Sequence, residues 1–126
     1  MSREVRISAL DSLFSNFIRT RDKWTCQRCE RRFDSTNKFH RMALHNAHCV
    51  AGRGKHSTRF DEENCHALCY GCHSYLDSHP REMDAWFVGK YGQACWDAVH
   101  QRSHQIKQWR TAEKLALKLR LKSFRR

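Results

Sequence analysis

The chain has 126 residues, with 24 Lys and Arg against 13 Asp and Glu, which gives a formal net charge of +11. This length fits one small domain of roughly 100 to 150 residues, and no apolar run approaches the roughly 18 residues that a membrane span needs. So large a positive charge predicts a polyanionic partner, with simple solubilisation by charge as the alternative.

The first predicted element is an amphipathic helix within SALDSLFSNFIRTRD. Ser8 and Asp11 stand where a capping box would begin this helix, and we expect it to end near Thr20. One apolar stripe follows the i, i+3, i+4, i+7 spacing that buries a single helix face in a core. The members of this stripe are Leu10, Leu13, Phe14, Phe17 and Ile18.

Two cysteine pairs with C-x-x-C spacing frame the middle of the chain: CQRC holds Cys26 and Cys29, and CYGC holds Cys69 and Cys72. Zn²⁺ prefers four soft ligands in a tetrahedron, which two such pairs supply. The odd total of seven cysteines and the polar start argue against a secreted disulfide scaffold. We therefore predict a structural zinc ion with a closed shell, which cannot activate water. The remaining thiols are expected to be small buried hydrophobes: Cys49, Cys65 and Cys95.

The segment between the cysteine pairs is predicted to form a short hairpin. FHRMALHNAHCV, from Phe39 to Val50, has strand-like character, and AGRGKHSTRFDEEN supplies the glycines and charges of a basic, mobile loop. After the second pair we expect a helix with Pro80 at its first position and Gly92 at its end. Its predicted packing residues are Met83, Trp86 and Phe87.

The last 26 residues hold nine Lys or Arg, one acidic residue and no Gly or Pro, which predicts a long basic helix. LALKLRL also fits a terminal strand, which stays open as an alternative. We divide the chain into a core, residues 1–92, and a basic helical extension, residues 93–126. The extension is expected to contact phosphates, unless Trp109, Leu115 and Leu119 bury it as core or as a dimer face. Its basic residues are Arg102, Lys107, Arg110, Lys114, Lys118, Arg120, Lys122, Arg125 and Arg126.

Three polar residues gather around the second cysteine pair. His48 lies on the predicted hairpin, Asn64 precedes the pair, and His73 directly follows Cys72. A His73 helix anchored by zinc would project beside the strand that carries His48, so one histidine could hold a divalent cation while the other handles a proton. Most of the other histidines are expected to be ordinary surface or core residues.

The pattern that joins AHCV, RFDEENCHALCYGCH and both C-x-x-C pairs resembles an HNH endonuclease of the ββα-metal class. Within that class, LDSLFSNFIRTRDKWTCQRC, STRFDEEN and CYGCH are most similar to the phage recombination proteins of the NinG (Rap) family. The resemblance covers roughly residues 8 to 90. It implies an α+β, mostly helical fold, in which a small zinc-stapled ββα-metal (HNH) core carries an N-terminal helix and basic C-terminal helices.

The resemblance also implies site residues and a reaction, the metal-dependent hydrolysis of DNA phosphodiesters. His48 corresponds to the general base, Asn64 to the residue that orients the His48 loop or completes the metal shell, and His73 to a ligand of Mg²⁺ or Mn²⁺. Many HNH nucleases have a metal ligand directly before the base, where this chain has Ala47. His45, three positions before His48, resembles instead the spacing of an acidic ligand in zinc-knuckle junction resolvases, so we expect it as the second ligand. Phosphates of the substrate are expected to pass the loop residues Arg53, Lys55 and Arg59.

The favoured hypothesis is thus an endonuclease that acts on branched or recombination-intermediate DNA in the cytoplasm of a phage-infected bacterial cell, without membrane attachment. A symmetric junction as substrate would favour a homodimer. One alternative is a non-catalytic zinc-knuckle protein that binds DNA as a recombination accessory. A zinc-stabilised protein-interaction adaptor is the other, and the net charge argues against it.

Overall fold

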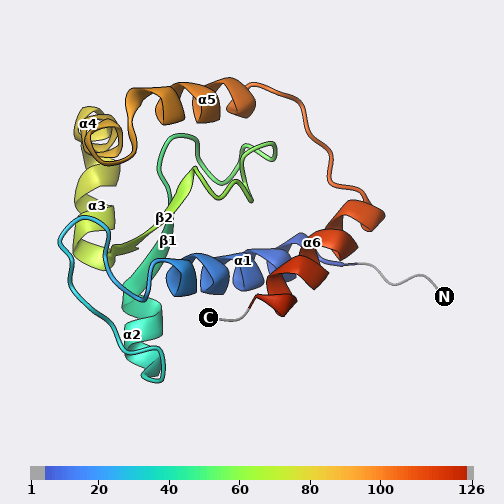
Figure 1. Cartoon of the computed structure of the whole chain (residues 1–126), viewed down its shortest axis with the longest axis horizontal. Helices are drawn as coiled ribbons and strands as arrows, with labels where there is room; N and C mark the ends of the chain where they lie inside the picture. Colours follow the sequence, from blue (N-terminus) through green and yellow to red (C-terminus); the bar gives the residue numbers. More distant parts are fainter. Residues whose placement is uncertain (1–4, 125–126) are drawn as a thin grey trace.

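The computed structural model describes residues 5–124, and these residues form helices around one small antiparallel sheet (Figure 1). The predicted class, α+β and mostly helical, is confirmed. No helix in the described range is both long and apolar enough to cross a membrane. The elements in chain order are α1 (Ile7–Arg21), α2 (Lys38–Ala43), β1 (Leu44–His48), β2 (Cys65–Cys69), α3 (Tyr70–Ser78), α4 (Pro80–Tyr91), α5 (Gln93–Ser103) and α6 (Thr111–Ser123).

The sheet consists of β1 and β2, and α3 follows β2 directly. Leu44 pairs with Cys69 at one end of the sheet and His48 pairs with Cys65 at the other. Every residue of β2 is buried, because α1 and α3 pack against the strand pair. The long connection between the strands, residues 49–64, returns the chain beside β1 (Figure 1). The antiparallel pairing thereby places the start of α3, which follows Cys69, beside the start of β1 at Leu44.

Helix α1 confirms the predicted apolar stripe, since Leu10, Phe14, Phe17 and Ile18 are its buried residues. The predicted capping box is wrong. Arg6 is the N-cap and makes no side-chain cap hydrogen bond, and the carboxylate of Asp11 instead accepts two hydrogen bonds from Arg59. A long-range ion pair has taken the side chain that the local sequence pattern assigned to the cap.

The predicted hairpin is confirmed over residues 44–69, but its first five residues are helical. Helix α2 begins after Asn37, whose side chain accepts hydrogen bonds from the backbone N–H groups of Phe39 and His40. An Asn at this N-cap position satisfies two donors that a strand would leave free. Helix α3 also begins earlier than expected, at Tyr70 rather than His73.

The C-terminal third confirms the helix at α4 and corrects the tail. Pro80 begins α4, and Gly92 ends it with a φ of 100° that favours glycine. The single long basic helix is wrong, because a non-helical segment, residues 104–110, separates α5 from α6. The alternative strand in LALKLRL is also wrong, since this stretch lies in α6. Arg125 and Arg126 lie outside the described residues.

Two apolar clusters hold these elements together. In the first, α6 returns to pack on α1, with Leu121 buried beside Phe14 and Phe60 (Figure 1). Leu115 and Leu119 of the tail, which the alternative of a buried extension required to be covered, are exposed. The second cluster joins Cys26, Cys69 and Cys72 to α3 and α4. Its members from α4 include the predicted Met83 and Phe87, and Trp86 packs at the edge.

Candidate functional site

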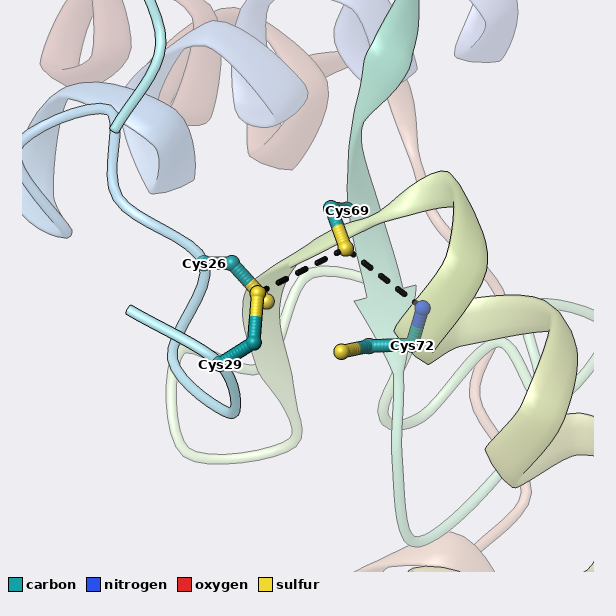
Figure 2. Close-up of side chains that lie close together, drawn as sticks. All are labelled: Cys26, Cys29, Cys69 and Cys72. Atoms are coloured by element: carbon teal, nitrogen blue, oxygen red, sulfur yellow. Dashed lines mark hydrogen bonds between the residues drawn. The ribbon is translucent and has the colours of Figure 1, made fainter. Parts of the chain in front are cut away.

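The four cysteines of the C-x-x-C pairs meet in one cluster, as predicted (Figure 2). Cys26 and Cys29 lie in the turn after α1, which an isolated bridge between Thr25 and Arg32 closes. The backbone N–H of Gln27 docks this turn on β2 by donating to the carbonyl of Ala67 at 2.9 Å. The other two members come from the end of β2 and the first turn of α3. They are Cys69 and Cys72.

The geometry of this four-cysteine cluster fits a tetrahedral zinc ion. All four Sγ atoms lie within 4.8 Å of one another, and the sulfurs of Cys29 and Cys69 are 3.8 Å apart. A tetrahedron with Zn–S bonds of about 2.3 Å has sulfur–sulfur edges of about 3.8 Å. The cluster can therefore bind zinc with four thiolates, and such a shell leaves no position for water or substrate.

The thiols of this cluster differ in acidity. Burial opposes ionisation of Cys26, but backbone hydrogen bonds, that of Cys29 first, lower its pKa to about 7. Burial raises the pKa of Cys29 and takes the pKa of Cys72 to about 12. Arg28 lies 3.5 Å from the Cys72 sulfur and favours its thiolate. A zinc ion must therefore displace protons from at least two of these thiols.

A second group of polar side chains lines an open cleft of about 320 Å³ beside the sheet. His48 and Asn46 come from the same face of β1, because side chains two residues apart in a strand point the same way. His73 and Asp77 come from consecutive turns of α3, and α1 and the β1–β2 connection close the sides. The sequence-predicted His48 and His73 thus line one cavity, although they come from distant parts of the sequence.

His48 is held in one tautomer by the backbone. Its Nε2 lies 2.9 Å from the carbonyl oxygen of Arg59, and a carbonyl can only accept, so Nε2 carries the proton and Nδ1 keeps a free lone pair. Burial lowers the pKa of His48 below its ordinary value of 6.5. The neutral ring is the form that can accept a proton from a water molecule.

Asn64 is fully buried and fixes the loop that carries this carbonyl. Its Oδ1 accepts from the backbone N–H groups of Val50 and Ala51 at 2.8 and 3.0 Å. Its Nδ2 donates to the carbonyl oxygens of Ala51 and Thr58 at 2.8 and 3.3 Å. Of the two roles expected for Asn64, this hydrogen bonding matches the orientation of the His48 loop.

His73 has a different neighbour at each ring nitrogen. Its Nδ1 lies 2.9 Å from Nδ1 of His45, and its Nε2 lies 3.2 Å from Oδ2 of Asp77. Only the Asp77 side belongs to the cleft, because His45 is not among the residues that line it. The structure therefore brings His45 against His73 as expected, but His45 does not line the cleft that His48, His73 and Asp77 share.

Two possible cation ligands in the cleft, Asp77 and Asn46, were not predicted from the sequence. Asp77 follows His73 by four positions, a spacing that places both side chains on one helix face, and this signal was available in the sequence. Asn46 carries a buried Oδ1 for which no hydrogen-bond partner exists in the described chain. An amide oxygen of this kind is a suitable ligand for a hard cation, but no sequence pattern distinguishes it from other strand asparagines.

The basic residues predicted to contact DNA have different surroundings. Arg53 and Lys55 are exposed on the β1–β2 connection, whereas the guanidinium of Arg59 is bound to Asp11. Arg120 pairs with Glu62 at 2.5 Å, and Lys107 pairs with Glu113. Lys122 also interacts with another group of the chain. No ion pair with a carboxylate occurs within the described chain for Arg110, Lys114 and Lys118.

Comparison with known proteins gives one match. A family model described as the bacteriophage lambda NinG protein matches residues 2–126, which is nearly the whole chain. Neither the curated proteins nor the solved structures gave a match.

Proposed function

Because the chain belongs to the bacteriophage lambda NinG family, a family of phage recombination-associated proteins, we propose that it is a metal-dependent DNA endonuclease of the HNH type. One observation carries the proposal. His48 from β1 and His73 from α3 line the same open cleft. Because Nε2 of His48 is bonded to a backbone carbonyl, the lone pair on its Nδ1 is free to accept a proton. The order β1, β2, α3 is the arrangement expected for a ββα-metal core.

In this proposal His48 is the general base. Its neutral ring takes a proton from the attacking water at Nδ1, while Nε2 stays bonded to the Arg59 carbonyl. That carbonyl is fixed from two sides. Asn64 holds the nearby loop backbone, and the Asp11 carboxylate accepts two hydrogen bonds from the Arg59 side chain. The role of Asn64 is therefore to position the base, without contact to the substrate.

The cleft also fits a divalent cation such as Mg²⁺ or Mn²⁺. Nε2 of His73, the carboxylate of Asp77 and the unpartnered Oδ1 of Asn46 would hold it, and oxygen-rich ligand sets suit these hard cations. When bound, the cation would stabilise negative charge on the phosphate and on the leaving oxygen. His45 was expected as a second ligand. The contact between their Nδ1 atoms would let His45 position the His73 ring, and its role as a ligand stays a prediction.

Cleavage of purified protein on branched and linear DNA tests the proposal, with Mg²⁺, Mn²⁺ or no added divalent ion. We expect ion-dependent strand cleavage, and His48→Ala should reduce its rate about 10²- to 10⁴-fold, the usual contribution of a general base. His104→Ala is the matched control, because His104 is exposed at the end of α5 and bonds to its own helix. Equal rates for His48→Ala and wild type would refute the assignment of the base.

A non-catalytic DNA-binding protein is the second candidate, and the net charge of +11 favours it equally. It predicts DNA binding that weakens with salt, and no ion-dependent cleavage of any substrate. The same assay separates the two functions, because binding and cleavage are read on one gel. A protein that binds branched DNA but leaves it intact with both ions is the outcome that supports this candidate.

A further inference from the structure

A second cavity, of about 490 Å³, adjoins the cleft along α1 and α2. The two cavities share Asp11, Ser15 and Arg53, so a chain-like ligand can pass from one into the other. The new cavity, which we call the α1–α2 groove, has basic side chains on both walls. These are Arg19 from α1, Lys38 and Arg41 from α2, and Arg53 from the β1–β2 connection.

The charge of this groove is not balanced within the described residues. Lys38, Arg41 and Arg53 form no ion pair with a carboxylate in that part of the chain. Asp11 is the single acidic residue that lines the groove, and Arg59 already binds its carboxylate. Burial, followed by the charge of Arg41, lowers the pKa of Arg19. An anion in the groove would relieve this repulsion between like charges.

Helix α2 carries two large exposed apolar side chains, Phe39 and Met42, and Met42 lines the groove. Phe39 is 69% exposed and Met42 is 72% exposed, and their i, i+3 spacing puts both on one helix face. The helix is nevertheless firmly attached. His40 accepts a hydrogen bond from the backbone N–H of Asp34 at 2.8 Å, and its ring meets the ring of Phe33. Figure 1 shows α2 projecting from the start of β1, away from the other helices.

We propose that the α1–α2 groove binds the phosphates of one unpaired DNA strand and that Phe39, supported by Met42, stacks on a base of that strand. The positive charges next to Phe39 favour a single DNA strand as the ligand. Lys38 lies 5.8 Å from the ring of Phe39, and Arg41 lies between the two apolar side chains in the sequence. Positive charge that follows a backbone, next to an aromatic face, is the arrangement that binds single strands without sequence preference.

This inference extends the proposed function, because the strand would lead from the groove toward His48 and His73. The shared Arg53 lines both cavities and would contact the phosphate between them. Fully paired DNA keeps its bases stacked inside the duplex, where Phe39 cannot reach them. The site therefore distinguishes DNA with an unpaired arm from blunt duplex.

Binding measured without added Mg²⁺ or Mn²⁺ tests the inference on the zinc-loaded full chain. The probes are a blunt duplex, the same duplex with a single-stranded arm, and the single strand alone. Phe39→Ala should weaken binding of the armed duplex and the single strand about five- to one-hundred-fold, the range for loss of one base stack, and leave the blunt duplex unchanged. Phe39→Trp should restore the loss. Ile106→Ala is the control, because Ile106 is fully exposed on the segment before α6.

A second variant tests the charges of the groove. Arg41→Gln should weaken single-strand binding and reduce the slope of log affinity against log salt by about 0.7, the value for one phosphate on a single strand. Lys90→Gln, on the exposed side of α4, should change neither quantity. A 2-aminopurine base placed at the first unpaired position should change its fluorescence with wild type and not with Phe39→Ala.

Three results would overturn the inference: unchanged affinity of Phe39→Ala for the armed duplex, an equal loss on blunt duplex, or an equal loss in Ile106→Ala. If Phe39→Ala alters self-association and leaves every DNA affinity unchanged, the apolar pair is a protein contact and the inference also fails. The proposed cleavage is judged separately. A protein that prefers the armed duplex but never cuts DNA refutes the nuclease alone, and one that cuts but ignores Phe39 refutes this site alone.

Discussion

The four-cysteine cluster and the histidine cleft use neighbouring residues of one helix for opposite purposes. Cys72 and His73 are consecutive in α3, yet Cys72 points to three other thiols and His73 points to the cleft. The cluster has four identical soft ligands and no open position. The cleft combines two histidines, two aspartates and an asparagine around an open cavity. Proximity in the sequence therefore gives no information about which of the two chemistries a residue serves.

The difference also separates stability from activity. Zinc in the four-cysteine cluster would join the turn after α1 to β2 and α3, so its binding energy becomes folding energy. The cleft residues contribute little to the core, because Asp77 is exposed and His48 and His73 are only partly buried. Asn64 is the exception, since it is fully buried and also builds the cleft. Variants of the two regions should therefore fail in different assays.

The largest expected effect is that of Cys69→Ser. This change removes one of the four thiolates and leaves zinc an incomplete shell, so we expect the protein to lose its tightly bound zinc and to unfold. Metal analysis and circular dichroism measure both losses. Cys95→Ser is the control, because Cys95 lies outside the cluster on α5. A Cys69→Ser protein that retains zinc and melts as wild type does would contradict the structural role.

The second prediction concerns the pH dependence of zinc binding. The thiols of Cys29 and Cys72 have raised pKa values and are protonated at pH 7 without metal, so zinc must displace both protons. Affinity should therefore fall by at least about 100-fold for each unit that pH decreases near neutrality, and more where other thiols of the cluster, such as Cys26, also bind a proton. Competition with a chromogenic chelator at several pH values measures the slope. A pH-independent affinity would show that these thiols are already ionised before zinc binds.

The third prediction compares the two asparagines near the cleft. Asn64→Ala leaves the backbone N–H groups of Val50 and Ala51 without partners and should cost about 2 to 4 kcal/mol in the free energy of unfolding. Asn46→Ala removes an oxygen that has no partner, so its effect on stability should be much smaller. Urea unfolding of the zinc-loaded proteins decides between them. Equal losses would mean that Asn64 does not hold the loop.

The smallest expected effect distinguishes Asp77 from His45 as a cation ligand. Asp77→Asn should raise the Mg²⁺ or Mn²⁺ concentration needed for half-maximal cleavage by at least about tenfold, because it removes the charge next to Nε2 of His73. His45→Ala removes the contact to Nδ1 that positions the His73 ring and should have the weaker effect. Titration of cleavage rate against each ion measures both. A larger shift for His45→Ala would return His45 to the role of ligand.

Local patterns were sufficient wherever a residue's role depends on its near neighbours. The C-x-x-C spacing predicted the four-cysteine cluster, the stripe of Leu10 and Phe14 predicted the buried face of α1, and Pro80 predicted the start of α4. The spacing of three residues turns two thiols toward one point, and the period of a helix aligns its apolar side chains. These features survive in any fold that contains the segment.

Predictions failed where a distant residue competed for the same side chain. Asp11 suits a helix cap by its position, but Arg59, 48 residues later, binds its carboxylate. The tail has no helix breaker, yet residues 104–110 are not helical and the chain turns back so that Leu121 can pack against α1. Burial of apolar surface outweighs the modest preference of a polar segment for continuous helix.

The sequence by itself determined the apolar face of α1, the start of α4 and the four-cysteine cluster, because each of these follows from residue type and spacing. The family resemblance indicated the two histidines that line the cleft. Only the tertiary structure decided which face of His73 meets the cleft, that Asn64 directs all its hydrogen bonds to the loop, and that Asn46 and Asp77 join the site. The reason is physical. Hydrogen bonds and cavities form between side chains whose distance depends on how whole elements pack, and that packing minimises exposed apolar surface over the entire chain.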